Sequence, residues 1–426
     1  MLERKVTISK EKKEEKRNTF LPKFMEWGII SKENYSEDKP LPIKRWDPLS
    51  TVKIQAREFG YRKDHTRYYG HYSYISPIRG TRPKGFSDPS KKRKDFEKSS
   101  EKLYKEPVDI FTSVTEGKPI YKEDGTQLGD GYTIIISEDS KRRDNPFSDK
   151  PHKIERLPAS CKACTLINRY PAMARVIDPE IKKKIDVNNT SKLSLGINLV
   201  TLSRDFYPSL SFQKVPDEVL TGIFNSMKTA IIYSVQEAIE RNFYDIPISP
   251  FFNIGKKVGG SQPRVHSQVY IDLAMDGHGS RLDGYLNAFK EMGDNCHLCQ
   301  TSHGEEQRIL LETKFWIFYV TASPVRNYHL RFYPKEHIRR FSQLKVNQYR
   351  DLSKSLKKIF KALDEIEVNE NRNIIFNSTP FGYDANFHLF ADIIPYEIIG
   401  GAEMADNMRV ARKLPEDVAE EIRSVL

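Results

Sequence analysis

The chain has 426 residues, which is enough for two or three packed units that each have a hydrophobic core. Hydrophobic residues make up 38% of it and charged residues 30%, and no apolar run approaches the roughly 18 residues of a membrane-spanning helix. The N-terminus also lacks an apolar signal core. The sequence therefore excludes membrane-spanning helices, and we expect a cytoplasmic protein with no membrane partner.

The net charge of +11 lies mostly in the N-terminal third. The first 150 residues carry 33 basic and 25 acidic side chains, a surplus of eight. Arginine and tyrosine side chains are interleaved between Lys53 and Tyr74, at the end of a basic extension that we place at 1–72. Such side chains can stack on bases and bind phosphates, or form the polar rim of a half-buried strand. One alternative is therefore a protein that binds RNA, DNA or a ribonucleoprotein through this region.

A short predicted strand at 73–75 leads into a turn that carries Arg79 and Arg82. Two guanidinium groups in one turn make a suitable clamp for a pyrophosphate. A basic surface turn is the alternative. The residues that follow, from about 84 to 156, are charged and interrupted by glycine and proline, and we interpret them as an insertion.

From about residue 157 the sequence contains a weak internal repeat. Each copy has a Cys-x-x-Cys pair, predicted strands, and a Phe-Asn pair followed by a final strand with a histidine. Each also has a long amphipathic helix, at about 217–241 in the first copy and 346–366 in the second. In an intracellular protein, paired cysteines at this spacing indicate metal binding or redox chemistry.

The repeat predicts an α+β fold of two fused units, each an antiparallel sheet with one long helix. We place the first unit at residues 73–290, including the insertion, and the second at 291–426. The extension at 1–72 is expected to be irregular. Either unit is long enough to form its own core.

The stretch at 259–268, with the sequence GGSQPRVHSQ, is the most informative part of the chain. A glycine-rich loop can expose backbone N–H groups to a phosphate. In the strand that follows, His266 and Gln268 share one face. A lone histidine at a strand start is more often structural, but a neutral imidazole beside such a loop can also attack phosphorus.

This stretch resembles the active-site motif of the galactose-1-phosphate uridylyltransferase family, a two-unit branch of the histidine-triad superfamily. The turn around Arg79 and Arg82 is similar to the family's N-terminal Ser-Pro-x-Arg-x-x-Arg-Pro motif. The resemblance implies a nucleotidyltransferase that acts on nucleotide sugars and sugar phosphates through a covalent nucleotidyl-histidine. Dinucleoside polyphosphates and nucleotidylated polymer ends are alternative substrates. A homodimer is one of the assemblies left open.

The resemblance also implies the roles of individual residues. His266 would be the nucleophile, and Gln268 would hydrogen-bond a non-bridging oxygen of the α-phosphate. The remaining candidates would bind the nucleotide or its phosphates: Arg79, Arg82, Asn168, Asn253, Gly259, Gly260, Ser261 and Arg264. For the two asparagines among them, the alternative role is to stabilise a turn.

Zinc is the expected cofactor. A structural zinc site needs four sulfur or nitrogen ligands at the corners of a tetrahedron. Cys296 and Cys299 supply one pair, and the resemblance implies that His337 and His388 complete the site. His303 is the alternative fourth ligand.

The first unit lacks an obvious second zinc site. The resemblance matches Cys161 and Cys164 to another zinc pair, but Phe206 and Arg264 stand at the positions of the expected histidines. Two thiolates alone do not close a site. The pair is therefore open to a further ligand, to redox chemistry, or to a four-cysteine site between the units.

Overall fold

The computed structural model describes most of the chain from Cys161 onward and separate segments before it. The described ranges are 161–274, 280–300, 306–401 and 411–426, with breaks at 169, 177, 187–190, 295 and 385, and before them 29–53 (except 34, 39 and 40), 68–75, 111, 115, 120–121, 127–129 and 134–137. Most of the basic extension, together with Arg79 and Arg82, lies outside these residues. The nucleic-acid alternative and the arginine clamp therefore stay predictions.

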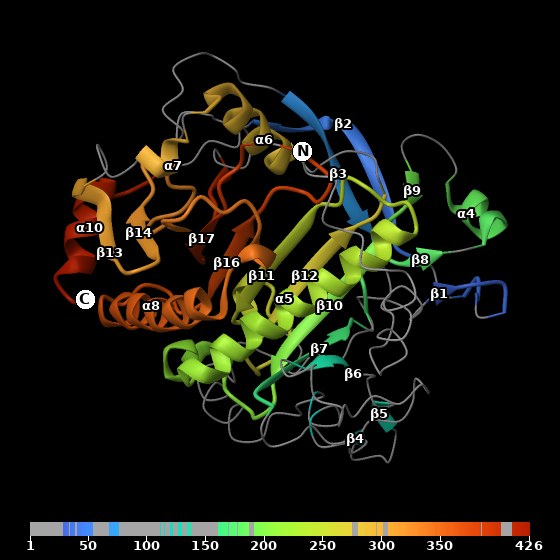
Figure 1. Cartoon of the computed structure of the whole chain (residues 1–426), viewed down its shortest axis with the longest axis horizontal. Coiled ribbons are helices and arrows are strands. Elements are labelled where there is room, and N and C mark those ends of the chain that lie inside the picture. Colours follow the sequence, from blue (N-terminus) through green and yellow to red (C-terminus); the bar gives the residue numbers. More distant parts are fainter. Residues whose placement is uncertain are drawn as a thin grey trace, which may run out of the picture.

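A ten-stranded antiparallel sheet forms the centre of the molecule (Figure 1). Strands rich in β-branched and aromatic residues build it, as expected for a sheet with buried faces. Its order is β13 (Ile309–Glu312), β14 (Trp316–Val320), β15 (Leu330–Pro334), β17 (Phe390–Pro395), β16 (Arg372–Asn377), β11 (Ile248–Ile254), β12 (His266–Asp272), β10 (Gly196–Ser203), β7 (Ala163–Ile167) and β6 (Ile134–Ser137).

The sheet consists of two matching halves that meet at β11 and β16. Phe251 pairs with Ile375 across this junction, and the two residues pair on their outer sides with Gln268 and Asp392. Gln268 in the first unit therefore corresponds to Asp392 in the second. The predicted α+β fold with two antiparallel units is confirmed, and the units share one continuous sheet.

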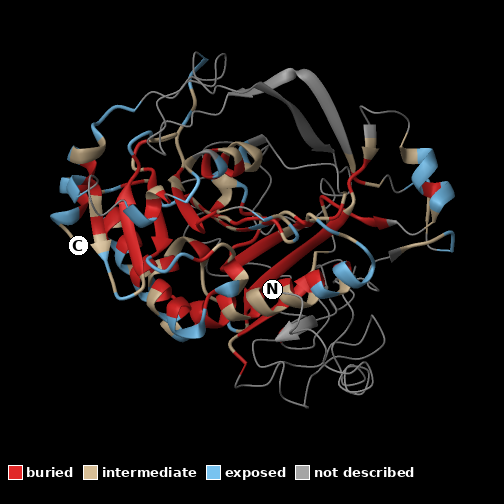
Figure 2. Ribbon diagram, turned by 45° about the horizontal axis from the view of Figure 1, so that its top comes forward, coloured by how far each residue is buried: buried red, intermediate tan, exposed pale blue. Residues whose placement is uncertain are grey.

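Two long helices cover one face of the sheet, α5 (Asp217–Glu240) and α8 (Val346–Glu365). Asp217 and Glu218 in the first turn of α5 favour the positive end of its dipole. Phe224 of α5 stacks on Tyr349 of α8, with 5.7 Å between ring centroids. The central strands and the inner sides of the helices are buried, so the main core lies between sheet and helices (Figure 2).

The opposite face differs between the units. In the second unit it is covered by α6 (Ser280–Met292) and α7 (His297–Gln300), which form a second core. Phe289 of α6 lies 6.5 Å from Phe390 of β17, measured between ring centroids. The strand face that carries Phe390 is therefore closed by α6.

Smaller elements surround the sheet. No helix in the described part of the chain is long and apolar enough to cross a membrane. The small sheets and remaining helices are β1 (Ile29–Ile30) with β8 (Arg175–Val176); β3 (Tyr68–Ile75), β2 (Ile43–Lys53) and β9 (Ser191–Leu193); β4 (Ile120–Tyr121) with β5 (Gln127–Gly129); α4 (Pro179–Ile185) and α10 (Pro415–Arg423); and the 3-10 helices η5 (Ser209–Lys214), η6 (Lys256–Val258), η8 (Glu306–Arg308) and η9 (Phe341–Gln343).

Candidate active site and metal centre

The glycine-rich loop is a compact turn around η6. Gly255 and Gly259 have φ angles of 89° and 92°, a region that favours glycine. A Cβ on Gly260 would lie 2.6 Å from the carbonyl oxygen of Gly255, so this position also excludes a side chain. The N–H groups of Gly259 and Gly260 donate to the carbonyls of Lys256 and Gly255 at 3.1 and 3.0 Å. The phosphate contacts expected of these two N–H groups therefore find no support in the loop geometry.

His266 lies at the first position of β12, directly after this loop, and pairs with Leu202 of β10. Its Nδ1 lies 2.8 Å from the carbonyl oxygen of Arg264. In a neutral imidazole this contact requires Nδ1 to carry the proton, which leaves the lone pair on Nε2. The side chain is 4% exposed, and the ring of Phe111 lies 6.1 Å away between centroids.

Gln268 follows two positions along the same strand. The pleat of β12 directs Val269 and Ile271 into the core beneath α5, so His266 and Gln268 lie on the opposite face. Gln268 is 6% exposed. The imidazole of His266 and the carboxamide of Gln268 thus share one strand face.

The two candidate asparagines, Asn253 and Asn168, differ in their hydrogen-bond partners. The Oδ1 atom of Asn253 accepts a hydrogen bond of 2.8 Å from Nδ2 of Asn373, which belongs to the second unit. The Oδ1 atom of Asn168 accepts from the N–H of Tyr170 at 2.9 Å, which is the turn geometry named as its alternative role. Ser261 is half-buried at the end of the loop.

Arg264 is buried, with 3% of its surface exposed. One guanidinium nitrogen donates to the carbonyl oxygens of Ser203 and Arg204 at 2.7 and 2.8 Å. The guanidinium carbon lies 5.8 Å from the ring centroid of Phe206. These contacts give the side chain a structural role, so the phosphate contact expected of Arg264 finds no support.

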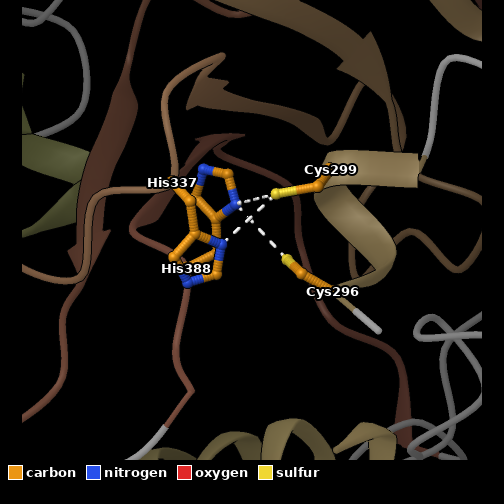
Figure 3. Close-up of side chains that lie close together, drawn as sticks. All are labelled: Cys296, Cys299, His337 and His388. Carbon is orange, nitrogen blue, oxygen red and sulfur yellow. Dashed lines mark hydrogen bonds between the residues drawn. The ribbon is translucent and has the colours of Figure 1, made fainter. Parts of the chain in front are cut away.

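Four predicted zinc ligands form one cluster in the second unit (Figure 3). Their ligand atoms all lie within 4.8 Å of one another. The three contacts between sulfur and Nδ1 are 3.3 Å for Cys299 and His337, 3.4 Å for Cys296 and His388, and 3.5 Å for Cys299 and His388. In a tetrahedron with ordinary zinc bond lengths, sulfur and nitrogen ligands are about 3.6 Å apart. The cluster therefore fits a zinc ion.

The surroundings of the cluster also suit a cation. Nε2 of His388 lies 2.7 Å from the carbonyl oxygen of Pro334, which directs Nδ1 towards the two sulfurs. Burial lowers the pKa of His388 to about 4, so the imidazole is neutral, as a metal ligand must be. Burial raises the pKa of Cys296 to about 12, and a bound cation would reverse this by stabilising the thiolate.

The two cysteine pairs do not occupy equivalent positions. Cys164 of β7 pairs with Leu202 of β10, and the corresponding pair in the second unit is Ile317 with Tyr333. Cys164 therefore corresponds to Ile317, whereas the second cysteine pair lies at α7, ahead of β13. Cys161 and Cys164 are both buried, and neither belongs to a cluster of three or more potential ligands among the described residues. The expected match between the two pairs is thus wrong.

A buried ionic cluster occupies the position in the second unit that corresponds to Gln268. Asp392 contacts Nε of Arg331 at 2.8 Å, Nε2 of His329 at 3.1 Å and a guanidinium nitrogen of Arg281 at 3.2 Å. Burial alone would raise the pKa of Asp392, but the charges of the two arginines and the contact with His329 outweigh it and hold the pKa well below its usual range. The sequence signal, which we missed, was a charged residue in each of two otherwise apolar strands.

Two fused units, each with an antiparallel half-sheet and one long helix, define a galactose-1-phosphate uridylyltransferase-like fold. The histidine strand lies in the first unit and the cysteine–histidine cluster in the second. Among known proteins the sequence resembles the same family, which confirms the expected resemblance.

No protein-family model matches the chain. It is 26% identical over 142 residues to galactose-1-phosphate uridylyltransferase of Haemophilus influenzae, a match that covers 32% of this chain and 41% of that protein. The match to the enzyme of Thermotoga maritima is 26% over 143 residues and covers 33% and 45%. The chain thus matches less than half the length of either relative.

A similar solved structure is an ADP-glucose phosphorylase from Arabidopsis thaliana with bound ADP-glucose. It superposes with a TM-score of 0.55 at 18% identity and covers 91% of this chain and 99% of that one. At this identity the likeness shows the shared fold, and it extends over both units.

Proposed function

We propose that the protein is a nucleotidyltransferase that acts on nucleoside-diphosphate sugars and uses His266 as its nucleophile. The observation that carries the proposal is the 2.8 Å contact between Nδ1 of His266 and the carbonyl oxygen of Arg264. It fixes the tautomer in which Nε2 is the nucleophilic atom. The relatives named above, a uridylyltransferase and a phosphorylase of sugar nucleotides, support the substrate class.

In the first step, Nε2 of His266 attacks the α-phosphorus of the nucleotide sugar. An N–P bond forms, the bond from the α-phosphorus to the bridging oxygen breaks, and the sugar 1-phosphate leaves with the bonding electrons. The imidazole keeps its Nδ1 proton throughout, and the carbonyl of Arg264 stabilises the positive charge that develops on the ring.

In the second step, a phosphate oxygen of an acceptor attacks the nucleotidyl-histidine and returns the electron pair to Nε2. The acceptor is a different sugar 1-phosphate in a uridylyltransferase-like reaction, or inorganic phosphate in a phosphorylase-like one. Gln268, two positions from His266, would donate its carboxamide N–H to a non-bridging oxygen in both steps. His266 and Gln268 therefore act in both steps of the proposed reaction.

Further residues would bind the nucleotide and support the fold. Asn253 and Ser261 lie in or beside the loop that precedes His266, and Arg79 and Arg82 remain candidates from the sequence. Cys296, Cys299, His337 and His388 would hold a zinc ion that cross-links the second unit, where it supplies structural stability.

The test is the intact mass of the protein after incubation with UDP-glucose, ADP-glucose or a dinucleoside polyphosphate. We expect a nucleotide-sized adduct with one donor, lost on addition of sugar 1-phosphate or phosphate and absent from a folded His266→Ala variant. The donor that reacts identifies the base, and the acceptor that discharges the adduct separates transferase from phosphorylase. An absence of adduct with every donor, in protein shown to be folded, would refute the proposal.

A further inference from the structure

The residues before the final strand of each unit occupy matching positions. In the second unit, His388 precedes β17 by two residues and contacts the carbonyl of Pro334 at the end of β15. In the first unit, Arg264 precedes β12 by two residues and contacts the carbonyl of Ser203 at the end of β10. Both contacts are 2.7 Å long.

The neighbouring contacts also match. The N–H of Val265 donates to the carbonyl of Tyr207 at 2.7 Å, and that of Leu389 donates to the carbonyl of Ile338 at 2.6 Å. In the first unit the acceptor, Tyr207, directly follows Phe206, the ring beside Arg264. In the second unit the acceptor, Ile338, directly follows His337, the other histidine of the metal cluster. These backbone contacts thus match between the units, whereas the side chains that meet there differ.

We infer that Arg264 replaces a metal ion in the first unit. In the second unit a cation held by His337 and His388 would tie the start of β17 to the end of β15. In the first unit the guanidinium of Arg264, packed on Phe206, ties the start of β12 to the end of β10. Among the described residues the chain therefore offers one zinc site, and the guanidinium of Arg264 takes the place of a second ion.

A guanidinium is well suited to this exchange. It stays charged at any working pH, donates to several carbonyl oxygens at once, and packs flat on an aromatic ring. Two carbonyls, from Ser203 and Arg204, converge on one nitrogen of Arg264. The metal alternative does not fit here, because Phe206 offers no ligand atom and, among the described residues, Cys161 and Cys164 belong to no cluster of three or more potential ligands.

Arg264 is then a positioning residue for His266. Its side chain fixes the backbone whose own carbonyl accepts the Nδ1 hydrogen bond of His266. Loss of the guanidinium would let this carbonyl rotate away from Nδ1. His266 would then populate both neutral tautomers. The consequence for the reaction rate rests on the proposed function, whereas the consequences for metal content and tautomer do not.

The metal content is the first test. We expect one zinc ion per chain in the wild-type protein, one in the double variant C161S/C164S, and none in C296S, measured by plasma mass spectrometry. Two ions per chain, one of them lost in C161S/C164S, would overturn the inference.

The second test compares Arg264→Met with Arg372→Met. Arg372 is the control, because it is also buried, donates to backbone carbonyls and lies over a phenylalanine ring, that of Phe360, at 5.0 Å; it differs in an ion pair of 2.7 Å with Asp364. We expect R264M to shift His266 from the Nδ1–H tautomer towards a mixture, seen in long-range proton–nitrogen spectra of histidine-labelled protein. R372M should leave this tautomer unchanged.

The rate of adduct formation completes the test. We expect R264M to lower it roughly 10- to 100-fold with little change in KM, and R264K to recover part of it because the charge remains. A folded R264M with unchanged tautomer and rate would overturn the inference. If R264M does not fold, R264K and the zinc count decide. If the wild-type protein forms no adduct, the proposed function fails, and the zinc count and the tautomer still test Arg264.

Discussion

In the first unit, β12 presents His266 and Gln268 on the face away from α5, whereas in the second unit β17 presents Phe390 and Asp392 at the corresponding positions. The second pair faces α6, and Asp392 is neutralised by arginines. The first unit therefore carries polar side chains at two positions that the second unit uses for packing and ion pairing.

Stability and chemistry make opposite demands on such a site. Phe390 packs edge-on against Tyr285 of α6, with centroids 5.0 Å apart, and this contact closes the face. A ligand could not reach Asp392 without displacing α6. A duplicated unit relieves the conflict, because one copy can be filled with packing while the other can keep the polar side chains that the proposed chemistry needs.

Loss of the metal site should be the largest single effect. Cys296→Ser removes a ligand, and zinc binding contributes on the order of 10 kcal/mol to the folding of small zinc domains. We expect zinc content to fall to near zero and the Tm to fall by roughly 10–20 °C, which corresponds to a loss of about 5 kcal/mol in a domain of this size. Calorimetry with zinc analysis checks this. An unchanged Tm together with lost zinc would contradict a structural role for the ion.

Asp392 and Gln268 occupy corresponding positions, and we expect substitution of the first to lower stability and of the second to lower activity. Asp392→Asn leaves Arg331 buried without its counter-charge, so we expect it to lower the free energy of unfolding by about 3–5 kcal/mol in a urea titration. Gln268→Ala should leave stability within about 1 kcal/mol and slow adduct formation roughly 100- to 1000-fold. The reverse pattern, with activity lost in D392N and stability in Q268A, would refute the division of roles.

The pH dependence of stability should report Asp392. Because its pKa is lower in the folded than in the unfolded protein, its contribution is complete above the unfolded value of about 4 and is lost as the pH falls below it. We expect the difference in unfolding free energy between wild type and D392N to shrink by about 1.4 kcal/mol per pH unit below pH 4. Both proteins keep the same metal ligands, so the difference isolates this carboxylate. A constant difference down to pH 3 would contradict the assignment.

The sequence predicted those features that depend on local spacing. The helix expected at 217–241 is α5 at Asp217–Glu240, and the one expected at 346–366 is α8 at Val346–Glu365, because an apolar stripe at helical spacing marks both. The shared strand face of His266 and Gln268 follows from the two-residue period of a strand. The four-residue cluster in the second unit was found through the family resemblance, which implied His337 and His388 as partners of the cysteine pair.

What the sequence did not predict depends on pairing between distant strands. The identical spacing of the two Cys-x-x-Cys pairs suggested equivalence, but the pairing of Cys164 with Leu202 gives the first pair another place in the sheet. The carbonyl contacts of Arg264 likewise depend on how β10 meets β12. The register between strands that are distant in the sequence decides such contacts, and local sequence patterns do not predict that register.

The smallest expected effect lies at the junction of the two units, where Asn373 of β16 donates to Oδ1 of Asn253. Asn373→Ala removes this hydrogen bond and a second, longer one of 3.3 Å to the carbonyl of Val258, so we expect a stability loss of about 1–2 kcal/mol. Asn253 would then lose its fixed orientation, which should raise KM for the nucleotide sugar roughly 3- to 10-fold with kcat nearly unchanged. Steady-state kinetics, with the donor that forms the adduct in the mass measurement, give both constants. Asn377→Ala serves as the control, because Asn377 contacts Asp392 in the second unit at 3.3 Å and should cost stability without altering KM. If N373A lowers kcat instead, Asn253 acts on the reacting phosphate and not on binding alone, and the second unit then contributes to the chemistry of the first.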